Sequence, residues 1–224
     1  MSNYHPTLVY HWFLRVVHWA IAGAVALLLP LGILIAVADD LKVPEANADV
    51  VVGIHAAIGF FFASAILIRV ILLFAWGDTS GWRDVAPHTR AQFNIARDTI
   101  KYYLKGFRGG PPLYYGHNPF AGIVYTAFFF FALTQAASGI TMVVVHLLTE
   151  GGGNKAAKAY ADAAFIAHDV GALFVIFYVF AHLGALALHD IVERRGLASS
   201  MISGCKFFND EELKELEARK GRGR

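Results

Sequence analysis

Cysteine is almost absent from this chain of 224 residues, in which Cys205 is the only one. A single cysteine allows neither an internal disulfide nor an iron–sulfur cluster held by this chain's own thiolates. Charged residues are also few, at 16% of the chain, and the net charge of +2 does not suggest a nucleic-acid partner. The sequence contains no phosphate-binding glycine loop, nucleophile elbow or zinc-ligand spacing. The function must therefore be sought in the apolar segments and the histidines.

Apolar residues dominate the composition: 57% of the chain is hydrophobic and the mean hydropathy is +0.50, too high for a soluble domain of this size. Four segments almost free of charge exceed the roughly 20 residues that a spanning helix needs. Because the backbone must satisfy its own hydrogen bonds in lipid, these segments are predicted to be helices. The predicted fold is all-α, an integral membrane four-helix bundle over residues 1–208 followed by a charged cytoplasmic tail over 209–224. The predicted helices cover about residues 16–38, 50–76, 119–149 and 163–189.

The first apolar segment ends in Ala36-Val37-Ala38, which resembles a signal-peptide cleavage site. The segment is longer than the usual core of about 7–15 residues in a signal peptide, and no basic cluster precedes it. We therefore expect it to be retained as a membrane helix.

Lysines and arginines are unevenly distributed between the loops. Loop 77–118 contains six and the segment after Asp190 contains eight, whereas loops 39–49 and 150–162 together contain three. Cytoplasmic loops of membrane proteins are enriched in these residues. Both termini and loop 77–118 are therefore predicted to be cytoplasmic, and the two shorter loops are predicted to face the outer side.

Four histidines lie within the apolar segments. His168 and His182 are fourteen residues apart, which corresponds to four helical turns, a rise of roughly 21 Å and nearly the same helix face. His18 lies near the start of the first segment and His55 near the start of the second. In the predicted topology, His18 and His182 share a depth near the inner face of the membrane, and His55 and His168 share one near the outer face.

Polar side chains are costly in lipid, so two depth-matched histidine pairs indicate ligands rather than isolated polar groups. Two axial pairs suit two haems stacked across the bilayer, which together would form a path for electrons. The alternative of another class is a transporter whose histidines bind metal ions or relay protons.

The fourteen-residue step recurs from His18 to Gly32 and from His55 to Arg69, as on the facing seam of a left-handed helix bundle. Gly32 and Gly139 are thus candidates to leave room for the flat ring of the outer haem. Arg69 is a candidate partner for a propionate of the inner haem. Helix–helix contact through small residues, and extension of the arginine to the membrane interface, are the alternatives.

Several motifs occur in a specific order between about Tyr10 and Phe208. They are Arg15-Val16-Val17-His18-Trp19, Gly116-His117-Asn118-Pro119, His168-Asp169-Val170-Gly171 followed by His182, and Met201-Ile202-Ser203-Gly204 with Lys206-Phe207. In this order they resemble the b-type cytochrome subunit of membrane-bound nickel–iron hydrogenases. The wider group includes formate dehydrogenase gamma subunits and thiosulfate-reductase-type cytochromes, which share a four-helix core with two haems. The Gly-His-Asn-Pro run favours the hydrogenase branch.

The resemblance implies a multi-pass protein of the bacterial inner membrane with two haem b groups, whose irons would be held by His18 with His182 and by His55 with His168. It also implies a partner, a periplasmic hydrogenase made of a large subunit and an iron–sulfur small subunit. Electrons would pass from the small subunit through this chain to the membrane quinone pool. The donor could instead be a formate dehydrogenase or another periplasmic oxidoreductase. The candidates for haem packing or propionate contact are Gly32, Gly139, Arg69 and Arg15.

The resemblance further implies a quinone site beside the inner haem, at the start of the third helix. His117 and Asn118 are candidate quinone contacts there, and His189 is a candidate proton donor. Asn118 before Pro119 is also a favourable start for a helix, so a capping role for Asn118 remains open.

Overall fold

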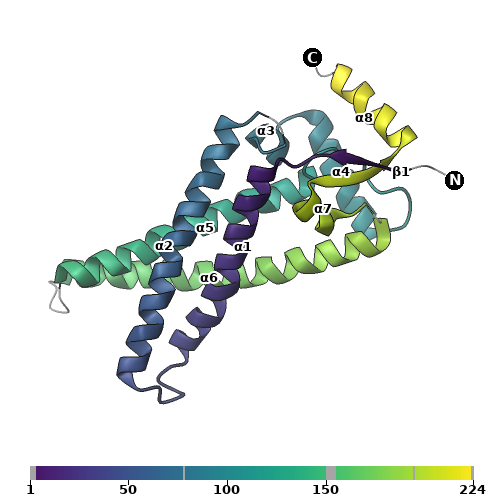
Figure 1. Cartoon of the computed structure of the whole chain (residues 1–224). Coiled ribbons are helices and arrows are strands. Elements are labelled where there is room, and N and C mark those ends of the chain that lie inside the picture. The colour runs from purple at the N-terminus through teal and green to yellow at the C-terminus, as the bar shows by residue number, and fades with distance from the viewer. Residues whose placement is uncertain (1–3, 78, 150–154, 194, 223–224) are drawn as a thin grey trace. The chain divides into compact units, whose positions relative to one another are not determined.

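The computed structural model describes residues 4–77, 79–149, 155–193 and 195–222. Four of its helices are long and apolar enough to cross a membrane: α1 (Trp12–Ala36), α2 (Glu45–Ala75), α5 (Pro119–Thr149) and α6 (Lys155–Glu193) (Figure 1). The other described elements are β1 (Tyr4–Leu8), α3 (Trp82–Val85), α4 (Arg90–Leu104), α7 (Leu197–Ser203), β2 (Cys205–Asn209) and α8 (Asp210–Arg222). The predicted all-α membrane class is confirmed.

The long helices extend beyond the apolar segments that predict them. The first begins at Trp12 rather than near residue 16, and α6 covers Lys155–Glu193 rather than 163–189. Each residue added to an existing helix gains a backbone hydrogen bond, so polar flanking residues continue it. Of the arginines that predict the orientation, Arg194 and Arg224 lie outside the described residues.

The chain forms two compact units, the first of which we call the helical unit. It comprises Val17–Val70 and Phe128–Phe180, and therefore holds parts of α1, α2, α5 and α6. All four helices contribute to its core, which consists of Ala24, Val25, Phe62, Ile66, Phe128, Ala132 and Val175. Aromatic rings stack between α5 and α6, with centroids 3.9 Å apart for Phe131 and Phe174. Because lipid is as apolar as these side chains, close van der Waals packing between the helices, rather than removal of apolar surface from water, holds them together.

The second unit, which we call the terminal unit, comprises the described parts of Met1–Val16, Ile71–Ala127 and Ala181–Arg224. Strands β1 and β2 pair antiparallel in it, with Tyr4 opposite Asn209 and Leu8 opposite Cys205. Buried side chains gather around this pair of strands: Val9, Tyr10, Leu14, Leu113, Phe208 and Leu216. The sequence predicts neither strand, and Leu216 shows that the segment expected to be a charged tail contributes to a core.

Helix α5 begins where the sequence places its start. The side-chain Oδ1 of Asn118 accepts the backbone N–H of Phe120 at 2.9 Å, and Pro119 is the first helical residue. This oxygen satisfies a donor that would otherwise lack a partner, and proline has no N–H to satisfy. The cap therefore fixes the backbone next to His117.

Candidate metal centre

The rings of His55 and His168 lie close together inside the helical unit. Their ring centroids are 6.2 Å apart and the ring planes are inclined by 69°. A bond from a metal ion to an imidazole nitrogen is about 2.0–2.1 Å long, and that nitrogen lies about 1 Å from the centre of its ring. Two imidazoles that bind one ion from opposite sides therefore have ring centroids about 6 Å apart. At the observed spacing, His55 and His168 could together hold one haem iron.

Two imidazoles do not complete the shell of a structural zinc ion, which takes four protein ligands. Within residues 4–77, 79–149, 155–193 and 195–222, no group of three or more His, Cys, Asp or Glu side chains is placed to hold a metal ion. A haem brings four nitrogen ligands of its own and takes its axial ligands from the protein. The pair of histidines therefore suits a haem better than a bare metal ion.

Two glycines lie beside the two rings. A Cβ added to Gly32 would lie 3.4 Å from Cε1 of His55, and one added to Gly139 would lie 3.4 Å from Cε1 of His168. A distance of 3.4 Å is an ordinary van der Waals contact, so each glycine places its backbone close against an imidazole. Gly32, predicted from the fourteen-residue step, and Gly139, predicted on the third helix, thus both lie at this site. Their role beside a haem stays a prediction.

The two imidazoles differ in their hydrogen bonds. Nδ1 of His168 lies 3.0 Å from Oγ of Ser138, on α5. The side-chain amide of Gln135, one turn earlier, donates to the backbone carbonyl of His168 at 2.7 Å. Nδ1 of His55 is buried and has no hydrogen-bond partner among the described residues. The sequence does not single out Ser138 or Gln135, because a polar residue inside an apolar helix does not reveal which neighbour it meets.

The other predicted haem residues lie as follows. His18 is on α1 in the helical unit and His182 is on α6 in the terminal unit, so their pairing stays a prediction. The side chain of Arg69 is buried, and its guanidinium lies 5.3 Å from the centre of the Phe129 ring. Arg15 donates from Nη1 to the carbonyl of Ile202 in the terminal unit, which ties the start of α1 to the end of α7.

Asp84, on the short helix α3, binds His117 in two ways. Its Oδ2 accepts the backbone N–H of His117 at 2.9 Å and lies 2.6 Å from the ring Nδ1. A Cβ at Gly116 would overlap the Asp84 carboxylate, and a Cβ at Gly122 would overlap the carbonyl oxygen of Val85. Both glycines are therefore needed for α3 to lie against the start of α5. The sequence does not identify Asp84, since glycines indicate a close approach without naming what approaches.

His117 is held between two tyrosines. Its side chain is 7% exposed, against 25% for that of Asp84. The ring of Tyr10 lies 5.4 Å from the His117 ring, and that of Tyr125 lies 5.5 Å away. Tyr125 also lies 6.4 Å from the ring of His182. The terminal unit thus connects a partly exposed carboxylate, a buried histidine and a predicted haem ligand through adjoining rings.

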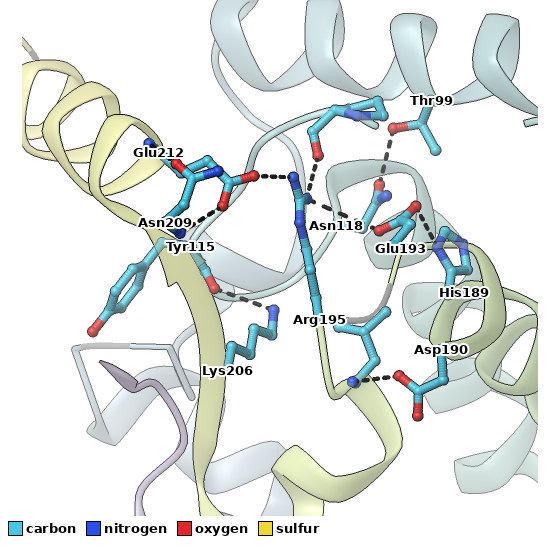
Figure 2. Close-up of polar contacts among 12 residues, drawn as sticks. Thr99, Tyr115, Asn118, His189, Asp190, Glu193, Arg195, Lys206, Asn209 and Glu212 are labelled. Carbon is cyan, nitrogen blue, oxygen red and sulfur yellow. Dashed lines mark hydrogen bonds and ion pairs between the residues drawn. The ribbon is translucent and has the colours of Figure 1, made fainter. Parts of the chain in front are cut away.

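Asn118 uses its side chain to organise the loop before α5. Besides capping the helix, its Oδ1 lies 3.4 Å from the hydroxyl oxygen of Thr99 (Figure 2). The Asn118 side chain also hydrogen-bonds Tyr114, whose pKa is raised above its usual value chiefly by burial. These contacts give the residue a structural role, and contact with quinone stays a prediction.

His189, near the end of α6, lies in a buried network shown in Figure 2. Its Nδ1 lies 2.7 Å from Oε1 of Glu193, and its Nε2 lies 2.8 Å from the hydroxyl of Tyr103. Burial, reinforced by the Glu193 charge, raises the pKa of Tyr103 to about 12, so the phenol keeps its proton. The neutral phenol and the Glu193 carboxylate thus each contact one ring nitrogen of His189 and hold the ring in place.

The same network reaches the C-terminal helix. Arg195 lies 3.9 Å from the Glu193 carboxylate and donates to Glu212 of α8 at 2.6 Å (Figure 2). Arg195 is 6% exposed, and a buried charge is tolerated where it is paired in this way. These ion pairs anchor α8 to the end of α6.

Lys206, in β2, is 1% exposed. Its ammonium donates to the backbone carbonyls of Tyr115, at 3.2 Å, and Gly116 (Figure 2 shows the first). It also lies 5.2 Å from the ring centre of Tyr10 and 4.8 Å from that of Tyr114. Burial lowers the pKa of Lys206 to about 7, because desolvation disfavours the charged form.

Comparison with known proteins gives a family match over most of the chain. The family described as prokaryotic cytochrome b561 matches residues 9–204. Three similar curated proteins are each named "Probable Ni/Fe-hydrogenase B-type cytochrome subunit". The protein of Cupriavidus necator is 26% identical over 91% of this chain and 88% of its own length. That of Bradyrhizobium diazoefficiens is 28% identical over 92% and 88%, and that of Azotobacter vinelandii is 26% identical over 91% and 89%. No solved structure matches the chain.

The family match covers all four spanning helices and includes the neighbouring imidazoles of His55 and His168. The spacing of these rings suits the axial ligands of a haem, which is the cofactor that the family name specifies. The chain therefore belongs to the prokaryotic cytochrome b561 family and is a b-type cytochrome of the membrane.

Proposed function

We propose that this chain carries electrons across the bacterial inner membrane through two b haems, from a periplasmic nickel–iron hydrogenase to membrane quinone. The single observation that carries the proposal is the 6.2 Å spacing of the His55 and His168 rings. The names of the similar proteins support the hydrogenase as donor. A bound haem would supply one-electron redox chemistry, and the protein would set its ligands, burial and position.

The outer haem would be held by His55 and His168, and the inner haem by His18 and His182. The glycines against both rings and the apolar core around them support a flat apolar cofactor at the outer position. Arg69 and Arg15 are the proposed partners for haem propionates, because guanidinium groups bind carboxylates in a forked geometry.

Quinone would be reduced at the start of α5, beside the inner haem. Reduction of a quinone to a quinol takes two electrons and two protons, so the site needs both an electron supply and a proton path. His117 is proposed to donate a hydrogen bond and a proton to the quinone oxygen. Asp84 accepts from the His117 backbone and lies against its Nδ1, which leaves Nε2 as the nitrogen available to quinone. His189 is a second proposed proton carrier, linked to Tyr103 and Glu193.

Haem content tests the proposal. The purified protein should contain two low-spin b haems, and a colourless protein would instead favour the transporter. His55→Ala or His168→Ala should remove one haem, and His18→Ala or His182→Ala should remove the other. His146→Ala is the matched control, because this histidine is exposed on α5 and is not a proposed ligand. A quadruple alanine variant that kept its haems would refute the ligand assignment.

The donor is tested by reconstitution. The membrane-bound protein, together with the hydrogenase expressed from the same cells, should reduce quinone with hydrogen as the electron source. If the haems were reduced by formate and not by hydrogen, the donor would be a formate dehydrogenase and the haem assignment would stand.

A further inference from the structure

The hydroxyl of Ser138 lies against both a backbone carbonyl of its own helix and the ring of His168. Ser138 is 6% exposed, and its Oγ lies 2.7 Å from the carbonyl oxygen of Thr134 and 3.0 Å from Nδ1 of His168. A serine hydroxyl has a single proton. At 2.7 Å from a carbonyl oxygen, which can only accept, that proton must point to Thr134. The same Oγ therefore accepts at His168, so Nδ1 of His168 is the protonated nitrogen.

This tautomer leaves the lone pair on Nε2 of His168 free to bind iron. We propose that Ser138 is a positioning residue that fixes His168 as an iron-ready ligand and strengthens it as an electron donor. The inference rests on the proposed haem at His55 and His168. A hydrogen bond from the second nitrogen of a ligating histidine fixes the orientation of its ring and raises its basicity.

The backbone of His168 is held as well. Gln135 donates from Nε2 to the His168 carbonyl at 2.7 Å. A Cβ on Gly171 would lie 2.7 Å from this same Nε2, so the amide fits because residue 171 has no side chain. Gln135 and Ser138 are three residues apart on α5 and therefore lie on one face of it, toward His168. Two side chains of one helix thus hold the ring and the backbone of one ligand on another.

The opposite ligand has no such support. Nδ1 of His55 is buried without a hydrogen-bond partner in the described part of the chain, and its ring lies against Gly32. The two axial ligands are therefore unequal, with His168 the anchored and more basic one. Because a more basic ligand favours ferric over ferrous iron, the Ser138 contact should lower the reduction potential of this haem.

Replacement of the hydroxyl tests the inference. Ser138→Ala removes the acceptor with little change of volume, and alanine is a better helix former than serine. The midpoint potential of one haem should shift upward while that of the other stays in place, and the affinity for the shifted haem should fall by roughly 10- to 100-fold. The matched control is Thr141→Ala on the same helix, since the Thr141 hydroxyl bonds only to its own helix at the Ala137 carbonyl. This control should shift neither potential.

The measurements are an optical redox titration, the ferric low-spin electron paramagnetic resonance spectrum and the haem content of purified protein. If Ser138→Ala loses one haem completely, Ser138→Thr should restore it, because threonine keeps the hydroxyl. Failure of Ser138→Thr to restore it would mean that the size of the residue matters and would overturn the inference. An unchanged potential in Ser138→Ala, or an equal shift of both haems, would also overturn it.

The same variants distinguish a failure of the Ser138 inference from a failure of the proposed haem ligands. If His168→Ala removes a haem and Ser138→Ala changes nothing, the proposed function stands and only the role of Ser138 fails. If His168→Ala keeps both haems, the ligand assignment itself fails.

Discussion

Oδ2 of Asp84 lies 2.6 Å from Nδ1 of His117, although 33 residues separate the two in the chain. The contact exists because Gly116 and Gly122 have no side chains where α3 meets the start of α5. It links a partly exposed carboxylate to a buried imidazole, which is the arrangement that proton delivery to a buried quinone would need.

Asp84→Asn should slow quinone reduction without affecting haem. Asparagine keeps an acceptor for the His117 backbone but removes the charge and the carboxylate's ability to pass on a proton. Both haems should bind and be reduced by the donor as in wild type, whereas quinone turnover should fall by roughly 100- to 10,000-fold, the range for loss of general acid–base catalysis. Asp98→Asn, on the exposed face of α4, is the control. Stopped-flow haem spectra combined with quinol assays separate the two steps.

His117→Gln should have a similar effect for a related reason. Glutamine keeps a polar group but cannot titrate, so the variant should assemble with both haems and accept electrons normally. Its quinone turnover should be slow, because glutamine cannot pass a proton to the quinone oxygen. Turnover at the wild-type rate would make His117 structural and place the quinone elsewhere around the inner haem.

Gly122→Ala should destabilise the terminal unit. The added methyl group would overlap the carbonyl oxygen of Val85, so α3 must move away from α5 and take Asp84 with it. Overpacking of this kind costs about 1–3 kcal/mol of unfolding free energy. Gly184→Ala, where a Cβ meets nothing within 4 Å, should be neutral or slightly stabilising. Thermal unfolding of the detergent-solubilised variants measures the difference, and equal melting temperatures would contradict the close approach.

Lys206 should make stability depend on pH. Its pKa is about 7 in the folded chain and near 10.5 when unfolded, so between these values the unfolded chain binds more protons. The free energy of unfolding should therefore rise as the pH rises from 7 to 9, by up to about 1.4 kcal/mol per unit. Lys206→Met should flatten this slope, and Lys214→Met, which removes an exposed lysine of α8, should keep it. Denaturant unfolding at pH 7 and pH 9 gives the slope, and a wild-type slope in Lys206→Met would assign the effect to other groups.

The orientation of the chain can be read with topology reporters. A reporter fused to the C-terminal end should be cytoplasmic, and one inserted at Lys42, in the loop between α1 and α2, should be periplasmic. The reason is that lysines and arginines are concentrated on the predicted inner side. The reverse result would place the His55/His168 site on the cytoplasmic side and exclude a periplasmic donor.

The sequence by itself determined the class of the protein. A backbone in lipid has no water to form hydrogen bonds with and must satisfy them within a helix. The length of the apolar segments therefore predicts four spanning helices, and these are confirmed. The order of the motifs around His18, His117 and His168 pointed to the cytochrome family, which the family match confirms. The cap at Asn118 was also predictable, because capping depends on residues adjacent in the chain.

The polar neighbours of the predicted site residues were decided only by the tertiary structure. Ser138 and His168, like Asp84 and His117, meet through the packing of separate helices, and nothing in the local sequence encodes their distance. The pairing of β1 with β2 joins the two ends of the chain for the same reason. Periodicity reports which face of a helix is apolar, whereas the identity of the residue that lies against it depends on how all the helices pack together.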